Sequence, residues 1–356
     1  MEIGIKKGLV KIPVVQTKYW PGTKGMLEAT EKYKGRARVR KDNQLVGWVA
    51  GYPFPKPKNA VELAWNYYPM SSRVSAHDDN WFFSAFYLFS KANFDRSFEL
   101  ELQDRKYMGR TDIPPLGDME LAKKKGIAFK ESIVITRPFD VRGFIQLRER
   151  SWNIYEEDRC YAYIPALRRI RRLTGTDVTD PLLGSDTIPD DFEVWRQKLN
   201  PKMTFKVLKL KDFLTPRTYL APKKPPYFGF KYDYKKNGPF MPIEWELRPM
   251  CVLEIKLNDP GYVYSKRVVY GDAMGIWLLY WGEQYDLKGR LWRANGQWGP
   301  SEDGKGFKNL FGWMYMNHMQ RHYTVMYGYP YYGLPMFKPL DESSSFTIQG
   351  LLKRVR

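Results

Sequence analysis

The feature that most constrains the fold of this chain is the alternation of residue types along most of positions 243–255. The odd positions of this run are apolar or weakly polar: Ile243, Trp245, Leu247, Pro249, Cys251, Leu253 and Ile255. Most even positions are charged: Glu244, Glu246, Arg248 and Glu254. Because successive side chains of a strand point to opposite faces, this run predicts one apolar and one polar face. A strand longer than the usual five or six residues is typical of a large, strongly curved antiparallel sheet.

Further strand patterns follow at short spacing, at 81–89, 98–102, 145–148, 262–270, 276–283, 289–297 and 322–327. Turn sequences such as Asn258–Gly261 separate them, and strands joined in this way form a meander. Few helices are expected, and the best candidates are Leu116–Lys125 and Asp190–Leu199. Residues 1–60 are rich in Gly, Pro and Lys and predict an extended N-terminal arm, because Pro fits neither a regular helix nor a central strand. Residues 61–356 are expected to form one domain.

The chain is strongly basic, with 58 Lys and Arg against 39 Asp and Glu and a formal charge of +19. Such a field attracts anions, which include nucleic acids, anionic lipids and carboxylates. The charge is spread along the chain and no nucleic-acid motif is present, so nucleic acid is not an expected partner. No apolar run approaches the roughly 20 residues of a membrane-spanning helix, so we expect no transmembrane segment and at most peripheral membrane contact.

Residues typical of catalysis are scarce. The chain has no G-x-S-x-G elbow, no P-loop and no dinucleotide fingerprint, and its only histidines are His77, His318 and His322. The sequence therefore predicts a protein that is not an enzyme and uses no cofactor or metal. The sequence His77-Asp78-Asp79 is interpreted as a polar turn. The two cysteines, Cys160 and Cys251, are compatible with a disulfide or with two free thiols.

Aromatic residues make up 16% of the chain and gather in dense runs such as 81–89. Such runs form either ordinary core or the wall of an apolar site. A curved sheet whose concave side is not filled by its own side chains leaves room for a hydrophobic guest. The candidate lining residues on that concave face are Phe98, Leu100, Trp245, Leu247 and Leu253.

A basic block follows in the sequence, with Arg168, Arg169, Arg171 and Arg172 close together. Arginine clusters bind carboxylate and phosphate groups, so this block is a candidate site for the polar headgroup of a lipid. The alternative is that it pairs with the acidic loop that contains Asp186, Asp190 and Asp191.

The segment from Tyr163 to Arg172 resembles a Y-x-P-x-x-R-R-x-R-R signature of an uncharacterised family of Gram-negative bacteria. This is domain-of-unknown-function family thirteen twenty-nine, often labelled outer-membrane lipoprotein-sorting protein. Three more parts of the chain carry the resemblance: 52–55 with 65–66, 185–192, and 264–272 with 285–292. Gly271 departs from the family pattern, which has a bulkier residue there.

The resemblance implies a fold similar to that of the lipoprotein carriers LolA and LolB, an incomplete antiparallel β-barrel with a few short helices. It also implies location in the periplasm or at the outer membrane, with a signal peptide removed from the mature chain. The expected function is to carry a lipid, a lipoprotein acyl chain or another hydrophobic compound. The alternative is an accessory protein that docks on an RND-type (MMPL-like) transporter or an outer-membrane protein without a ligand of its own.

Overall fold

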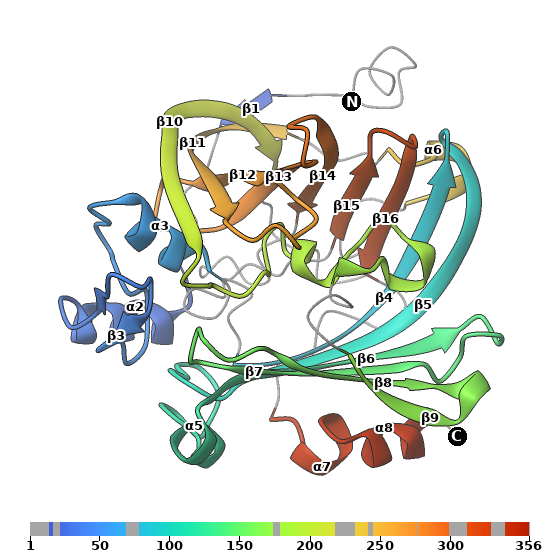
Figure 1. The fold of residues 1–356 in the computed structure, drawn as a ribbon, viewed down its shortest axis with the longest axis horizontal. Helices are drawn as coiled ribbons and strands as arrows, with labels where there is room; N and C mark the ends of the chain where they lie inside the picture. Colours follow the sequence, from blue (N-terminus) through green and yellow to red (C-terminus); the bar gives the residue numbers. More distant parts are fainter. Residues whose placement is uncertain are drawn as a thin grey trace.

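One large sheet dominates the structure, a computed structural model that describes residues 14–16, 22–68, 78–173, 179–217, 232–240, 245–275, 277–298, 312–328 and 339–355 (Figure 1). The sheet has 14 strands. Thirteen of them follow the order β1-β11-β12-β13-β14-β15-β16-β4-β5-β6-β7-β8-β9, and the remaining strand, β10, pairs with β11 at the end of the sheet opposite β9. All pairings are antiparallel except that of β1 with β11. Strands β9 and β10 do not pair with each other, so the curved sheet stays open, as expected.

The strand bounds are β1 Val14–Gln16, β2 Arg38–Val39, β3 Leu45–Val46, β4 Asp79–Ser90, β5 Asn93–Lys106, β6 Ile127–Arg137, β7 Ile145–Ser151, β8 Arg159–Ile164, β9 Arg169–Leu173, β10 Met203–Pro216, β11 Trp245–Leu257, β12 Lys266–Asp272, β13 Leu279–Tyr285, β14 Leu291–Trp298, β15 Gly312–Asn317 and β16 His322–Gly328. The α-helices are α2 Lys24–Tyr33, α3 Ala60–Tyr67, α5 Glu120–Lys125, α6 Tyr234–Asn237, α7 Glu342–Ser345 and α8 Ile348–Val355, with 3₁₀ turns η1 Pro165–Leu167, η3 Leu182–Gly184 and η4 Pro189–Asp191. Within the described ranges, none of these helices has the length and apolar character needed to cross a membrane.

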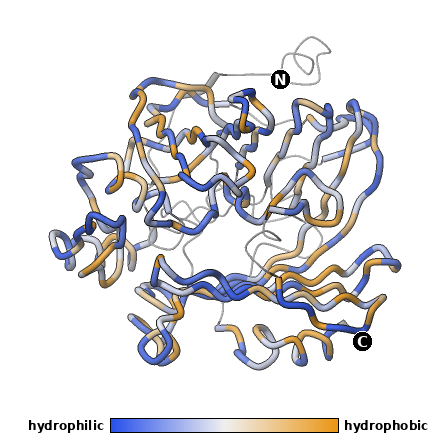
Figure 2. Tube along the Cα trace, viewed as in Figure 1, coloured by the Kyte–Doolittle hydropathy of each residue, from blue (hydrophilic) through white to orange (hydrophobic). Residues whose placement is uncertain are grey.

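Apolar and polar residues are interspersed along many strands (Figure 2). The predicted division of 243–255 into an apolar and a polar face is wrong for β11, where Glu246 and Arg248 are buried and Leu247 is 45% exposed, because the two charged residues pair with each other inside the fold. Residues 22–68 pack over the β11 end of the sheet, where Met26, Trp65 and Tyr67 share one core cluster with Leu253 and Val269. Helix α8 covers the opposite end, where Leu351 packs on Val134 and Ile145. The chain therefore covers part of the sheet near each end and leaves the edge strands β9 and β10 exposed.

The N-terminal range 1–60 is not uniformly extended. Residues 24–33 form helix α2, whose N-cap Thr23 accepts a hydrogen bond from the backbone N–H of Met26, and β2 pairs with β3. Residues 1–13 and 17–21 of the expected arm lie outside the described residues. The expected helix at Leu116–Lys125 is shorter and begins at Glu120.

The helix expected at Asp190–Leu199 does not form. Only the 3₁₀ turn η4 occurs there, and the chain then runs irregularly. The carboxylates of Asp190 and Asp191, which looked like helix-start residues, are used by tertiary contacts instead, and these contacts override local helix preference.

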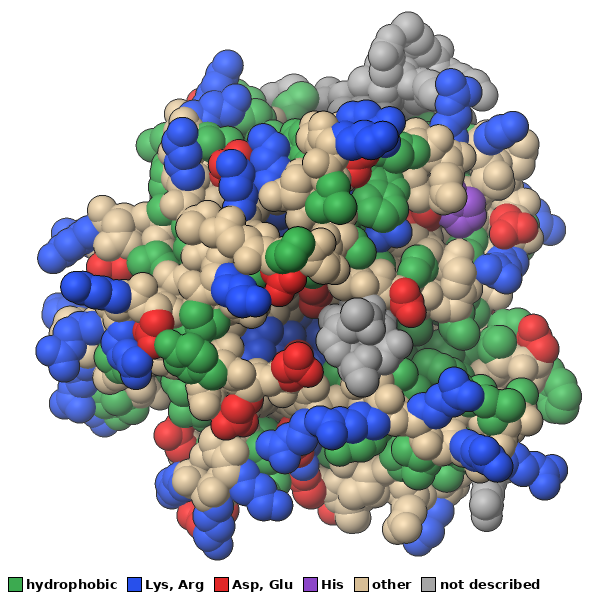
Figure 3. All heavy atoms as spheres, viewed as in Figure 1, with side chains coloured by type: hydrophobic (Ala, Val, Ile, Leu, Met, Phe, Trp, Pro, Cys, Tyr) green, Lys and Arg blue, Asp and Glu red, His purple; other side chains and the backbone are tan. Residues whose placement is uncertain are grey.

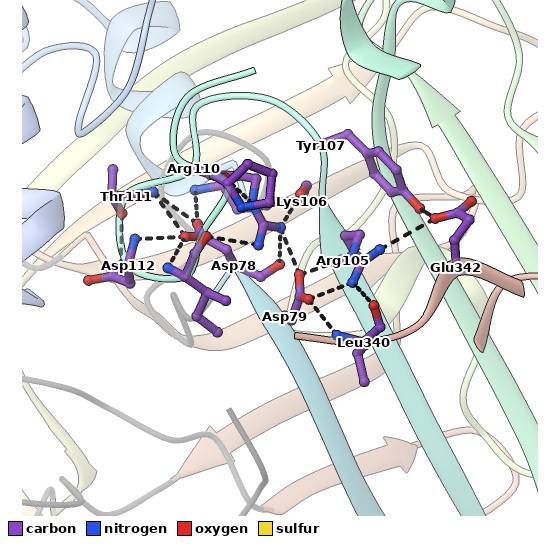
Figure 4. Close-up of polar contacts among 12 residues, drawn as sticks. Asp78, Asp79, Arg105, Lys106, Tyr107, Arg110, Thr111, Asp112, Leu340 and Glu342 are labelled. Atoms are coloured by element: carbon purple, nitrogen blue, oxygen red, sulfur yellow. Dashed lines mark hydrogen bonds and ion pairs between the residues drawn. The ribbon is translucent and has the colours of Figure 1, made fainter. Parts of the chain in front are cut away.

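Asp78 and Asp79 anchor the buried stretches at Ile113 and Leu340 to the start of β4, rather than forming a simple polar turn (Figure 4). Both are fully buried. Asp78 accepts hydrogen bonds from the backbone N–H groups of Thr111 and Ile113 at 3.0 and 2.8 Å. Asp79 accepts from Arg105 and Arg110, each at 2.7 Å. Carboxylates buried in this way cost little only where they are paired and hydrogen-bonded.

Replacing Asp79 with alanine should destabilise the fold strongly, because it leaves Arg105 and Arg110 buried without that carboxylate. We expect a loss of about 3–5 kcal/mol in the free energy of unfolding, measured by urea denaturation. The matched control is Asp95→Ala, since Asp95 lies on β5 and its side chain is 51% exposed. Equal stability of the two variants would contradict the anchoring role.

Candidate functional site on the concave face of the sheet

The concave face of the sheet is crossed by residues 182–199, which we call the inner segment. In Figure 1 this segment lies between the strands β12–β16 and the strands β6–β9. It contacts Arg267 of β12, Asn295 of β14, Thr324 of β16 and Glu131 of β6. A single irregular segment therefore bridges the two halves of the sheet.

Asp191 makes the densest set of these contacts. Its Oδ1 accepts from Arg267 Nη1 at 2.5 Å, and its Oδ2 accepts from the hydroxyl of Tyr264 at 2.7 Å. Its backbone carbonyl accepts from the amide of Asn295 at 2.6 Å. All four residues are buried, and burial together with the Asp191 charge raises the pKa of Tyr264 well above its usual value. The contacts give an irregular backbone the hydrogen bonds that it lacks within itself.

Asp186 ties the other end of the inner segment to β16. Its Oδ2 lies 2.6 Å from Nδ1 of His322 and accepts from the hydroxyl of Thr324 at 3.0 Å. Burial raises the pKa of Asp186, and the hydrogen bond from His322 opposes this effect. Among the described residues, no three His, Cys, Asp or Glu side chains gather in an arrangement that would hold a metal ion.

Apolar side chains of the inner segment fill the space between these polar contacts. Leu182 and Phe192 join the buried cluster that contains Phe98 and Leu100. Trp195, which is fully buried, joins the cluster that contains Leu253. The concave face is therefore occupied, in this conformation, by the protein's own chain.

Two hollows remain. The larger, about 470 Å³, lies where the β7–β8 connection, the end of the inner segment and the β11–β12 turn meet, and its lining mixes charged with apolar residues. Asp190 and Lys198 both line it. Burial raises the pKa of Asp190 and lowers the pKa of Lys198 to about 8, while the charge of Asp158 acts in the opposite direction on Lys198.

The smaller hollow, about 230 Å³, is mainly apolar. Tyr270 and Trp281, two of its lining residues, are register partners and so point away from the face that carries Val269. Leu214 has the other orientation, because it pairs with Leu247, which lies on the same face of β11 as Leu253. The hollow therefore lies at the β10 end of the sheet, and two of its lining residues, Met250 and Tyr280, belong to the buried cluster that contains Phe192. Its lining residues are Phe213, Leu214, Thr215, Pro216, Trp245, Met250, Tyr270, Tyr280, Trp281 and Glu283.

The five predicted lining residues do not form one surface. Phe98 and Leu100 are buried in the same cluster as Phe192 of the inner segment, and Leu253 is buried in another cluster. Trp245 lines the apolar hollow, and Leu247 is 45% exposed beside it, paired in register with Leu214. Sequence alternation identified which positions share a face of a strand, but not what covers that face.

The four arginines of the basic block are all exposed, at the end of η1 and on the edge strand β9. Pairing of the block with the acidic loop is wrong, because Asp186, Asp190 and Asp191 are bound by His322, Tyr262 and Arg267. The block also lines neither hollow, and lies far from the apolar hollow at the opposite edge of the sheet. Figure 3 shows other Lys and Arg side chains spread over the visible face.

Several positions that shape the site escaped sequence reasoning. Strands β6, β9, β10 and β15 were not predicted, although β10 carries four residues of the apolar hollow. Cys160 and Cys251 are free thiols on β8 and β11.

The departure from the family pattern at Gly271 has a direct structural reason. A Cβ at this position would lie 2.2 Å from the ring of Tyr67, so α3 can pack on β12 only over a glycine.

Removing the Asp191 carboxylate should loosen the inner segment. We expect Asp191→Ala to cost about 3–5 kcal/mol because Arg267 loses its buried partner, and to increase hydrogen exchange across residues 182–199. Asp180→Ala, at an exposed position just before the segment, is the control. Unchanged exchange in the Asp191 variant would show that the apolar contacts alone hold the segment.

Two solved structures of other proteins have a similar architecture. The crystal structure of an outer membrane lipoprotein-sorting protein domain from Vibrio parahaemolyticus matches with a TM-score of 0.53 at 18% identity, covering 80% of this chain and 97% of that one. A DUF1329 family protein from Desulfovibrio piger matches with a TM-score of 0.51 at 14% identity, covering 75% and 89%. At these identities the likeness shows a shared fold. No curated protein matches the sequence.

The family model described as "Protein of unknown function (DUF1329)" matches residues 3–351. This match spans nearly the whole chain, and it agrees with the family expected from the signature around Tyr163–Arg172 and with the open, curved antiparallel sheet. The chain belongs to the DUF1329 family.

Proposed function

We propose that this protein binds a hydrophobic molecule, such as a lipid or a lipoprotein acyl chain, in the periplasm or at the outer membrane. The observation that carries the proposal is the apolar hollow between β10 and β13, which opens beside exposed leucines. The fold shared with a lipoprotein-sorting domain supports it by analogy. The role is binding and carriage rather than catalysis.

The chemistry of the apolar hollow suits the end of an acyl chain. Trp245, Met250 and Tyr270 supply aromatic and thioether surface, which adapts to irregular apolar guests. Its volume equals that of about eight liquid waters at ~30 Å³ each, so it holds several methylenes rather than a whole lipid. Each methylene moved out of water contributes about 0.8 kcal/mol.

A longer guest requires more surface than this hollow provides. We propose that Phe98, Leu100 and Leu253 serve as additional lining in an open state in which the inner segment has left the concave face. In that state the clusters that Phe192 and Trp195 now complete would be exposed. A hydrophobic guest would then replace the apolar contacts of the inner segment.

The basic block has a separate part in this proposal. Arg168, Arg169, Arg171 and Arg172 are exposed at the edge of the sheet, where their guanidinium groups are available to phosphate or carboxylate headgroups. Since the block lies apart from the apolar hollow, we propose that it contacts the headgroups of a surface rather than that of the molecule inside the hollow.

The filled concave face favours a second candidate function. A protein whose interior is occupied by its own chain is also suited to docking on a partner, such as an RND-type transporter or another outer-membrane component, without a ligand of its own. The exposed basic block would then be the docking surface. The two candidates predict different outcomes for the variants below.

Filling the apolar hollow should weaken ligand binding. Leu214 lines the hollow and is 42% exposed, so Leu214→Trp should fold normally and occupy the space. We expect at least a tenfold loss of affinity for radiolabelled palmitate. Leu291→Trp is the control, because Leu291 is similarly exposed, at 37%, but lies on β14 outside both hollows. Palmitate binding that is unchanged in both variants, or absent from the wild type, would count against the hollow as the site.

Charge reversal of the basic block separates the two functions. The double variant Arg169→Glu/Arg171→Glu should leave palmitate affinity within about twofold if a hydrophobic molecule occupies the hollow. If docking is the function, the same variant should abolish association with envelope partners, measured by cross-linking in membranes. The control is Arg36→Glu/Arg38→Glu, a pair in the N-terminal part of the structure, far along the chain from β9.

A further inference from the structure

Strand β10 is an edge strand that exposes apolar side chains over much of its length. Residues 206–212 are all exposed, and within the described part of the chain β10 pairs with β11 alone (Figure 1). The exposed apolar residues are Val207 (43%), Leu208 (43%), Leu210 (69%) and Leu214 (42%), with Leu247 (45%) on β11. Single exposed leucines are common on soluble proteins, but a contiguous row of them indicates a surface that is covered in function.

The register brings three of these leucines onto one face. Leu214 pairs with Leu247, and Leu210 stands four residues before Leu214 on the same strand. Residues two and four apart on a strand share a face, so Leu210, Leu214 and Leu247 form one apolar patch. We call this the leucine patch. It lies beside the apolar hollow, because Leu214 belongs to both.

Lysines alternate with these apolar residues. Lys206, Lys209 and Lys211 are exposed on β10, and Asp212 is the one acidic residue of the strand. Lys209 lies over the ring of Phe213, with its ammonium 5.4 Å from the ring centroid. Long lysine side chains reach past an apolar surface and place their charge at the level of lipid headgroups. The strand therefore combines an apolar patch with a positive edge.

Anionic lipid fits this combination better than an added protein strand. Lysines and irregularities along an edge strand oppose pairing with another strand. Strand β10 has both features: it carries three lysines, and its register with β11 shifts between Val207 and Lys209. This shift interrupts the regular ladder of hydrogen bonds between the two strands. An anionic lipid surface offers both complementary charge and an apolar layer for the leucines.

We propose that β10 docks this protein on an anionic phospholipid surface, with the leucine patch entering the headgroup region and the three lysines contacting lipid phosphates. Docking in this way would place Phe213 and Leu214, at the mouth of the apolar hollow, against the lipid. The inference does not require that the hollow holds a lipid, because the surface of β10 and the lining of the hollow are tested separately.

Binding to vesicles tests the proposal on the full-length chain. Vesicles of phosphatidylglycerol and phosphatidylcholine should bind the protein in cosedimentation, and pure phosphatidylcholine vesicles should bind it much less. The triple variant Lys206→Gln/Lys209→Gln/Lys211→Gln should lose about fivefold in partition coefficient per lysine. Its control is Lys123→Gln/Lys124→Gln/Lys125→Gln, which removes three charges from α5.

The apolar part has its own variants. Leu208→Ser/Leu210→Ser removes apolar surface without touching the lining of the hollow, and should lower partition at least tenfold while leaving palmitate affinity unchanged. Leu287→Ser, at a position that is 66% exposed, is the control. Failure of the wild type to bind anionic vesicles, or equal losses in variants and controls, would overturn the proposal. So would a dimer in sedimentation velocity that Leu210→Ser dissociates, since the patch would then join two copies.

Discussion

The contact of Asp191 with Arg267 and Tyr264 is the interaction on which the interior of this protein depends. It holds an irregular segment against the concave face of an open sheet, with both charges buried. Without such partners, an irregular backbone could not be buried there, because its N–H and C=O groups would lose water and gain nothing. The ion pair of Arg196 with Glu131 at 2.7 Å does the same for the other half of the sheet.

The consequence is an interior with two kinds of contact. Phe192 and Trp195 contribute apolar contacts, which a hydrophobic guest could replace. The pairs Asp191–Arg267 and Arg196–Glu131 are different, because separating them leaves buried charges unpaired unless water enters. Opening of the concave face is therefore coupled to hydration of these charges, whereas binding at the apolar hollow, which none of these four residues lines, does not separate the pairs. This difference is the physical basis for placing the first contact of a ligand at the hollow.

An open sheet also has two free edges, and both are basic. Strand β9 carries Arg169, Arg171 and Arg172, and β10 carries its three lysines. Positive charge on an edge prevents association with other strands and, by the same means, attracts anions. The two edges differ in that the leucine patch accompanies only the lysines of β10. One property of the fold, its failure to close, thus creates both of the surfaces that we propose to be functional.

The alternation at 243–255 and the turn-separated strands after it were enough to predict a large, curved antiparallel sheet, and the run of arginines ending at Arg172 was enough to predict the family. Both are local patterns. Strand β10 escaped prediction because its exposed edge alternates lysine with leucine without a buried face, and the segment after Asp190 resembled a helix start because its carboxylates could serve a helix or a distant arginine equally well. Periodicity along the chain determined the sheet and which residues share a face. Only the tertiary structure decided what covers each face, since that depends on partners such as Arg267 that lie more than seventy residues away in the sequence.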